Sequence, residues 1–289
     1  MSTNPVWFIT GSSAGLGLAL TRYALSQGHT VIATSRNPAR TPELVAEVEK
    51  QGGKWLTLDA LSDENIIKET MQQAESIFGR LDIVVNNAAY CVLGSTEDVP
   101  DADVVTQMQV NFLAPLRITR AVLPGMRNRK SGVILNVSSA QGVCPSPATG
   151  IYAASKAAME AASDALGAEV APFGIRVLIA VPGAFRTNFA NAGVLSEPSE
   201  AYANDHPVGT RLGWVKSLGS GAAKGDPVKA AKVMFEAATG TGDFGTLVAK
   251  ENFLRVLIGP DCWRVADAKI TEFRRTLDAQ KELAGSTNL

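Results

Sequence analysis

Short apolar runs alternate along the chain with longer stretches of helical pattern. Apolar runs without interspersed polar residues indicate strands buried on both faces. We expect seven strands, at Val6–Thr10, Val31–Thr34, Trp55–Leu58, Ile83–Val85, Val133–Val137, Arg176–Val181 and Thr246–Ala249. A helix is expected from about Gly15 to Gln27, directly after the first strand. This alternation predicts an α/β fold, a doubly wound parallel sheet of the Rossmann type with helices on both faces.

The chain of 289 residues has no internal repeat and no linker-like stretch, so we interpret residues 1–289 as one domain. Residues 188–225 become irregular and rich in glycine and proline, yet carry Phe189, Tyr202 and Trp214. Such an insertion is either a lid over a ligand or a surface loop whose aromatic side chains pack on the body. Residues 266–289 form a tail in which a charged helix, Ala266 to Ala284, is expected to pack on the body or on another subunit.

Composition excludes several classes of function. Hydrophobic residues make up 46% and charged residues 19%, and the net charge is −1, so a folded globular protein is expected without nucleic acid or anionic membrane as partner. No apolar run approaches the roughly 18 residues of a membrane span. Three separated cysteines and two histidines offer no metal site, and no signal-peptide pattern opens the sequence. We expect a cytoplasmic enzyme without a metal.

Tyr152 and Lys156 stand four residues apart in an alanine-rich stretch of helix formers. Side chains at this spacing share one face of a helix. A cation beside a phenol favours the phenolate and lowers its pKa from about 10 toward neutrality. The pair is therefore a candidate for general acid–base chemistry, whereas a lone pair of this kind is often only a surface tyrosine near a lysine.

A glycine-rich turn, Thr10-Gly-Ser-Ser-Ala-Gly-Leu-Gly17, follows the first strand and opens the first helix. Strand, turn and helix N-terminus together form an anion site suited to a dinucleotide pyrophosphate. We assign to cofactor binding the turn residues Gly11, Ser12, Ser13, Gly15, Leu16 and Gly17.

The end of the second strand predicts which dinucleotide binds. NAD sites usually place an acid about 20 residues beyond the glycines, but here Ser35 and Arg36 stand instead. A hydroxyl and a cation suit a 2′-phosphate, so we expect NADP(H) in preference to NAD(H). The alternative is a solvated arginine at a strand end. Asp59, at the end of the third strand, is positioned to accept a hydrogen bond from the adenine amino group.

From Val6 to Thr187 the sequence resembles the short-chain dehydrogenase/reductase superfamily. The resemblance rests on the glycine turn, Asn86-Asn-Ala-Ala89, Asn111, Ser139, Tyr152 with Lys156, and Pro182-Gly-Ala-Phe-Arg-Thr187. Ala89 departs from the family pattern, which has glycine there. The resemblance extends the cofactor-binding set to Ala60, Asn87, Ala88, Tyr152, Lys156, Pro182, Gly183, Phe185 and Thr187.

The resemblance also implies a catalytic set of four residues. Tyr152 would donate a proton to a carbonyl oxygen, and Ser139 would hydrogen-bond the same oxygen. Lys156 would lower the pKa of Tyr152 and bind the nicotinamide ribose, while Asn111 would hold a water through its backbone. In this reading the cofactor carries the hydride.

Residues that follow these motifs predict an apolar, partly aromatic pocket. We assign to substrate binding Tyr90, Cys91, Gln141, Cys144, Phe185, Phe189, Tyr202 and Trp214. The expected function is reduction of a hydrophobic ketone or aldehyde, or oxidation of the corresponding secondary alcohol. The alternatives are a non-redox enzyme of the same fold and a non-catalytic NADP(H)-binding regulatory protein, but the complete catalytic set favours redox chemistry. A homodimer or homotetramer is expected from the family.

Overall fold

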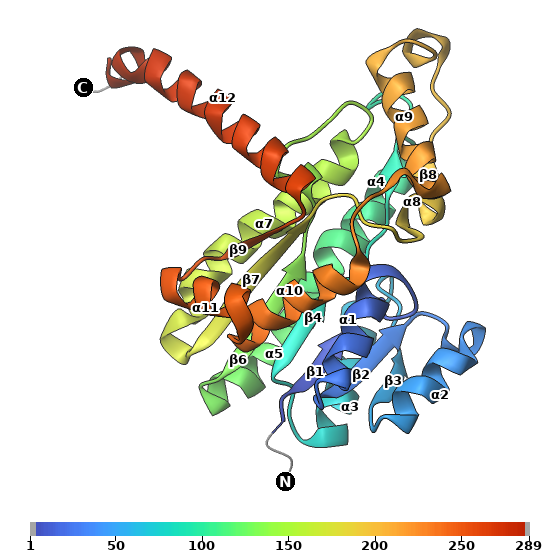
Figure 1. The fold of residues 1–289 in the computed structure, drawn as a ribbon, viewed down its shortest axis with the longest axis vertical. Coiled ribbons are helices and arrows are strands. Elements are labelled where there is room, and N and C mark those ends of the chain that lie inside the picture. Colours follow the sequence, from blue (N-terminus) through green and yellow to red (C-terminus); the bar gives the residue numbers. More distant parts are fainter. Residues whose placement is uncertain (1–3, 287–289) are drawn as a thin grey trace.

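A seven-stranded sheet forms the centre of the computed structural model, which describes residues 4–286. The strands are ordered β3-β2-β1-β4-β6-β7-β9, and all neighbouring strands run parallel. Helices cover both faces of this sheet (Figure 1). The predicted doubly wound α/β class is therefore confirmed. The outermost residues of the predicted domain and tail, 1–3 and 287–289, lie outside the described residues.

Six strands agree with the expected ranges to within one residue at each end. They are β1 Val6–Ile9, β2 Thr30–Ser35, β3 Lys54–Thr57, β4 Ile83–Asn86, β6 Gly132–Val137 and β7 Ile175–Pro182. The helices of the main body are α1 Gly15–Ser26, α2 Pro42–Lys50, α3 Glu64–Phe78, α4 Asp101–Met108, α5 Ala114–Arg129, α6 Ala140–Val143, α7 Gly150–Val170 and α10 Pro227–Thr239. A π-helical turn, η2 Gln109–Leu113, joins α4 to α5.

The core consists of one apolar layer on each face of the sheet. Successive residues of a strand point to opposite faces. Trp7 accordingly packs with residues of α1 and α10, whereas Phe8 packs with residues of α3 and α5. Both side chains are fully buried, which explains why the strands read as continuous apolar runs.

The seventh strand is not where the sequence pattern predicted it. Thr246–Ala249 lies within α11, Gly242–Glu251, and the edge strand is β9, Arg255–Ile258, which pairs with β7. Both segments are short and apolar, and such runs do not distinguish helix from strand. In α11 only one side is covered, with Val248 buried and Leu247 about half exposed.

The region 188–225 is more regular than expected. It contains α8 Phe189–Ala192, β8 Val194–Leu195, a 3₁₀ turn at Glu200–Tyr202, α9 Pro207–Ser217 and a π-helical turn at Leu218–Ala222. Strand β8 pairs with β5, Val92–Leu93, in a separate two-stranded sheet. This pairing places the region beside the segment that follows β4, over one end of the main sheet (Figure 1).

The C-terminal helix α12, Pro260–Gly285, begins six residues earlier than expected and projects away from the body (Figure 1). Cys262 and Ala266 anchor its first turns in the core, but all described residues from 270 onward are exposed. The expected packing of the tail on the body is therefore wrong beyond these turns. Packing on another subunit stays a prediction.

Candidate active site

Tyr152 and Lys156 lie on consecutive turns of α7 and are both buried, with 6% and 2% of their surfaces exposed. The Lys156 ammonium is 5.9 Å from the centroid of the Tyr152 ring. Its Nζ donates a hydrogen bond to the Val137 carbonyl, at 2.8 Å. The lysine therefore connects α7 to the end of β6 directly beside the tyrosine.

Burial controls the protonation of both groups. It raises the pKa of Tyr152 well above its usual range; the nearby Cys91 sulfur adds to this rise, and a hydrogen bond with Ser139 opposes it. Burial also lowers the pKa of Lys156 to about 8, against the opposing effects of Cys91 and Glu160. The expectation that Lys156 brings the phenol pKa toward neutrality is wrong for these residues by themselves, because desolvation outweighs the neighbouring charge.

Ser139 follows β6 and caps the short helix α6. Its Oγ accepts a hydrogen bond from the Gln141 backbone N–H, at 3.2 Å, and its side chain acts to lower the pKa of the nearby Tyr152 phenol. The Gln141 side-chain oxygen accepts from Thr149 Oγ1, at 2.8 Å, just before α7 begins. Ser139 and Tyr152 thus lie beside each other between the starts of α6 and α7.

Asn111 lies in the π-helical turn between α4 and α5 and is buried. Its side chain both accepts from the Tyr90 N–H and donates to the Tyr90 carbonyl, each at 2.8 Å, and it donates to Ser155 of α7 at 3.0 Å. The asparagine therefore joins the segment after β4 to the helix that carries Tyr152. Turns of this geometry frequently occur at functional sites. The water-holding role of its backbone stays a prediction.

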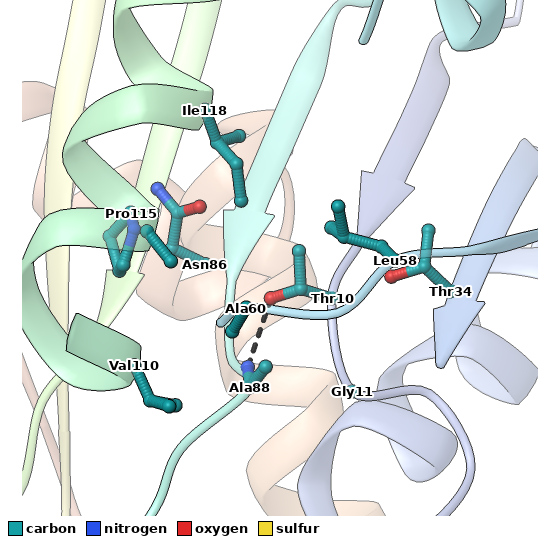
Figure 2. Close-up of a pocket in the computed structure, with 11 residues that line it drawn as sticks. Thr10, Gly11, Thr34, Leu58, Ala60, Asn86, Ala88, Val110, Pro115 and Ile118 are labelled. Atoms are coloured by element: carbon teal, nitrogen blue, oxygen red, sulfur yellow. Dashed lines mark hydrogen bonds between the residues drawn. The ribbon is translucent and has the colours of Figure 1, made fainter. Parts of the chain in front are cut away.

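The glycine turn fits closely against the end of β4. Gly11 has φ +70°, and a Cβ there would lie 2.9 Å from the Ala88 Cα. Thr10 Oγ1 accepts from the backbone N–H groups of Asn87 and Ala88, both at 2.9 Å, and the Asn87 amide donates to the Thr10 carbonyl at 2.8 Å. These contacts bring the first and fourth strands together at their carboxyl ends (Figure 2).

The predicted turn residues divide into two groups. The Ser12 hydroxyl points inward, donating to the Ile9 carbonyl at 3.0 Å and accepting from Thr21, so it stabilises the turn itself. Gly11, Ser13, Gly15 and Leu16 are partly exposed, whereas Gly17 is buried against the carbonyl of Gly11. Helix α1 has no side-chain cap and no acidic residue in its first turn, which leaves its N-terminal N–H groups available to an anion.

A small pocket lies beside the glycine turn, between the ends of β1, β2 and β4 and the π-helical turn (Figure 2). Ala60 and Ala88, two predicted cofactor residues, line it, and Val110 closes it from the π-helical turn. The full lining is Thr10, Gly11, Thr34, Leu58, Ala60, Asn86, Ala88, Val110, Ala114, Pro115 and Ile118. Asp59 stands next to this lining, and its Oδ1 accepts from the Leu61 N–H at 2.9 Å.

The end of β2 presents the residues that predicted NADP(H). Ser35 is buried and its Oγ accepts a hydrogen bond from Trp55 Nε1, at 3.0 Å. Arg36 is exposed directly after the strand. Arg40, at the end of a 3₁₀ turn, Pro38–Arg40, is also exposed and was missed by the sequence reasoning. The turn that carries this second arginine begins two residues after Arg36.

The segment after β7 lies against the glycine turn. Pro182 ends the strand, and a Cβ at Gly15 would lie 3.5 Å from Thr187. The Ala184 N–H donates to Asp261 Oδ2 at 2.7 Å, so a carboxylate of α12 fixes this segment. Gly183 packs against that carboxylate, and the partly buried Phe185 ring packs on the core near Gly225. Asp261 was not predicted, because its position depends on the contact between β9 and β7.

The predicted substrate residues occupy different positions around Tyr152. The Phe189 ring centroid is 5.9 Å from that of Tyr152, Cys91 is buried in the same apolar cluster, and Cys144 is half-buried after α6. Two hydroxyls are turned away from the site: Tyr90 donates to Asp103 at 2.9 Å, and Tyr202 donates to Glu97 at 2.8 Å.

Trp214 lies on the outer side of α9. It is 43% exposed, and its ring is 4.0 Å from the Arg211 guanidinium. Its role as a lid residue stays a prediction. A further set missed from the sequence is the buried amide network in which Asn86 donates to Asn136 at 2.8 Å and Asn136 donates to Ser163 at 2.7 Å.

Within residues 4–286, no cluster of three or more histidine, cysteine or acidic side chains is arranged to hold a metal. Across the same range, none of the helices combines the length and apolarity needed to span a bilayer.

The sheet order and the glycine turn define a doubly wound α/β protein in which tyrosine, lysine and serine side chains lie together beyond the carboxyl ends of the strands. The model of the short chain dehydrogenase family matches residues 5–196, and the chain belongs to this family, whose members act as oxidoreductases. The oxidoreductase claN of Passalora fulva is 42% identical over 68% of this chain and 88% of its own length. The oxidoreductase BOA17 of Botryotinia fuckeliana is 36% identical over 89% of both chains.

Solved structures show the same relationship. A short-chain dehydrogenase from Streptomyces avermitilis is 34% identical over the full length of both chains, with a TM-score of 0.88. Less similar structures were solved with different cofactors. A serine dehydrogenase with NADP⁺ is 27% identical over 81% of this chain and 89% of its own, with a TM-score of 0.69. A Burkholderia phymatum enzyme with NAD is 20% identical over 97% and 95%, with a TM-score of 0.74.

Proposed function

We propose that this protein is an NADP(H)-dependent oxidoreductase that reduces a ketone or aldehyde of a hydrophobic small molecule, or oxidises the corresponding secondary alcohol. One observation carries the proposal. Tyr152 and Lys156 are buried one helical turn apart, and the Ser139 side chain beside them acts to lower the pKa of the phenol. Burial of a titratable pair next to a hydroxyl, at the switch point of a doubly wound sheet, is typical of a catalytic site.

The site suits a dinucleotide. The glycine turn leaves no room for side chains at Gly11 and Gly17, and the uncapped start of α1 faces the same space. The pocket of Figure 2 offers apolar walls of a kind that fit an adenine ring, with Asp59 beside them. Asn87, Ala88, Lys156 and the segment from Pro182 to Thr187 would hold the nicotinamide half. When bound, this cofactor supplies or accepts the hydride.

Side chains of the protein itself would supply the proton that the carbonyl oxygen takes up. In the reduction direction Tyr152, kept protonated by burial, donates its phenolic proton to the carbonyl oxygen. Ser139 donates a hydrogen bond to the same oxygen and stabilises its developing charge. The Lys156 ammonium stabilises the phenolate left behind, and it exchanges protons readily because its own pKa is about 8. Asn111 positions the segment after β4 against α7.

The preference for NADP(H) rests on the end of β2. A 2′-phosphate would meet the Ser35 hydroxyl and the exposed guanidinium of Arg36, with Arg40 close by in sequence as a second cation. Family membership alone leaves this choice open, because solved neighbours were obtained with NADP⁺ and with NAD. A cation at the end of β2, where NAD sites usually have an acid, favours the phosphorylated form.

The substrate class follows from the residues around Tyr152. Phe189, Cys91 and the apolar side of Tyr202 form a wall with little charge. Such a wall favours a hydrophobic or aromatic carbonyl compound over a sugar or a short acid. We further propose that the protein acts in the cytoplasm as a homo-oligomer.

The test is absorbance of the nicotinamide with purified protein and a panel of hydrophobic ketones and aldehydes. The proposal predicts NADPH oxidation that depends on the carbonyl compound. Binding of NADPH without oxidation across the panel would favour a regulatory protein. Conversion of a substrate with no net change in NADPH would favour a non-redox enzyme.

A further inference from the structure

Glu160 is a buried carboxylate that the proposed chemistry does not use. It lies on α7 one turn beyond Lys156 and two turns beyond Tyr152, with 5% of its surface exposed. Its Oε1 accepts a hydrogen bond from Ser138 Oγ at 2.5 Å, and its Oε2 accepts from Arg255 Nε at 2.9 Å. Carboxylates are rarely buried unless they are paired and hydrogen-bonded in this way.

Arg255 fixes Glu160 from a different element. It stands at the start of β9, in register with Ile179 of β7. Its two remaining nitrogens bind both oxygens of Asp164, at 2.9 and 2.7 Å, one turn further along α7. A guanidinium held by two carboxylates has a defined orientation, so Glu160 cannot swing away from Ser138 without breaking this fork.

Ser138 is the residue immediately before the catalytic candidate Ser139. Its N–H donates to the Ala180 carbonyl of β7 at 2.7 Å, while its hydroxyl is held by Glu160. The preceding carbonyl, that of Val137, is bound by Lys156. Lys156 and Glu160 of α7 therefore hydrogen-bond with Val137 and Ser138, the two residues that directly precede Ser139.

The first turn of α6 closes over this contact. A Cβ at Gly142 would lie 2.7 Å from Glu160 Oε1 and 2.8 Å from Ser138 Oγ. The hydrogen bond between serine and glutamate is therefore shielded from solvent, where such a bond is stronger and its loss more costly.

We infer that Glu160, oriented by Arg255, is a positioning residue that holds Ser138 and thereby aims the Ser139 hydroxyl at the substrate oxygen shared with Tyr152. The inference rests on the proposed function. Through Arg255 and Glu160, β9 and α7 would position Ser139 in addition to packing in the core. A misplacement of about 1 Å in a catalytic group can reduce turnover by about a hundredfold, so a partial loosening of Ser139 should reduce it by about tenfold.

The charge of Glu160 also acts on Lys156, favouring its ammonium form. The titratable and charged groups that face Glu160 are Arg255 from β9, Lys156 on its own helix and the Cys262 thiol from α12, whose pKa is raised to about 11 chiefly by burial. Asp164 affects Glu160 only through Arg255, the guanidinium that both carboxylates bind. Removing the charge of Glu160 should therefore lower the pKa of Lys156 further.

The experiment compares Ser138→Ala, Glu160→Gln and the control Asp164→Asn in NADPH-dependent carbonyl reduction. Ser138→Ala removes one hydroxyl and little volume. In Glu160→Gln the amide cannot accept from both Ser138 and Arg255. We expect both variants to lower kcat by about tenfold, with the KM for NADPH within about twofold of wild type. Asp164→Asn, which leaves the Ser138 contact intact, should keep kcat within about twofold.

The pH dependence of activity, as a second readout, distinguishes a positioning role of Glu160 from a general effect on folding. Glu160→Gln should shift the alkaline fall of activity to lower pH, whereas Ser138→Ala, which keeps the charge, should not shift it. Wild-type kcat in folded Ser138→Ala would overturn the inference while leaving the proposed function intact. Absence of turnover in the wild type itself would overturn both.

Discussion

At the scale of the residue, desolvation decides how the tyrosine and the lysine are protonated. Spacing on a helix correctly predicted that Tyr152 and Lys156 share a face, but it could not predict that both are almost wholly buried. Burial raises the phenol pKa and lowers the ammonium pKa, so the pair is kept as a neutral proton donor beside an easily deprotonated amine. This arrangement suits the donation of a proton to a carbonyl.

The pH dependence of catalysis follows from the Lys156 pKa of about 8. Because this pKa lies below that of a free lysine, the ammonium is present below about pH 8 and is lost as the pH rises through that value. We expect kcat/KM for NADPH, which reports on the free enzyme, to be level below this point and to fall above it. A profile that stays level up to about pH 10, where a free lysine titrates, would contradict the account.

Among the residues at the end of β2, we expect the exposed Arg36 to contribute most to cofactor preference. Arg36→Asp places an acid where a 2′-phosphate would bind, and an acid there suits the ribose hydroxyls of NAD. We expect the ratio of kcat/KM for NADPH to that for NADH to fall by at least about tenfold, roughly the loss of one charge-assisted hydrogen bond. Lys50→Asp, on exposed α2, is the charge-matched control and should leave the ratio unchanged. An unaltered ratio in Arg36→Asp would exclude a role for this arginine.

At the scale of the element, the sequence predicted what local patterns determine and missed what packing determines. Five of these strands are buried along nearly their whole length and β3 only at Trp55, and their apolar runs indicated all six to within one residue at each end. The seventh was misplaced because Thr246–Ala249 and Arg255–Ile258 are equally short, and only pairing with β7 selects the second. The hydrogen-bond partners of Asn111 and Glu160 come from distant segments, so no spacing along the chain could have shown them.

Residues 188–225, the proposed lid, contact the body through the β5–β8 pairing, an apolar cluster and polar contacts such as the Tyr202–Glu97 hydrogen bond. Tyr202→Phe keeps the ring in its apolar cluster but removes this link. We expect the KM for the carbonyl substrate to rise about threefold, because the variant loses one hydrogen bond between this region and the body. The KM for NADPH should not change, and Thr210→Ala, on the exposed side of α9, should change neither. An unchanged KM for the carbonyl substrate would show that this contact does not order the lid.

At the scale of the whole molecule, the sheet order brings together groups that are far apart in sequence. The strand order reverses between β1 and β4, and the glycine turn, Asn87, Ser139 and Thr187 all follow the carboxyl ends of strands around this point. The position of the site is thus a consequence of the strand order, whereas the alternating pattern predicted only a parallel sheet with helices on both faces.

The outer half of α12 projects from the body, and its described residues from 270 onward are exposed (Figure 1). Ile270, Phe273 and Leu277 recur at helical spacing and are each more than half exposed. An apolar stripe of this kind is a common feature of association surfaces. It is consistent with the homo-oligomer that we propose.

The central claim is that Tyr152 gives its proton to a carbonyl group during NADPH-dependent reduction. The most direct measurement compares wild type and Tyr152→Phe in carbonyl-dependent NADPH oxidation, with NADPH affinity measured in parallel by fluorescence titration. We predict that the variant binds NADPH within about threefold of wild type and that its kcat falls by at least about a hundredfold, as expected when a general acid is removed. A variant that retains wild-type kcat would contradict the account.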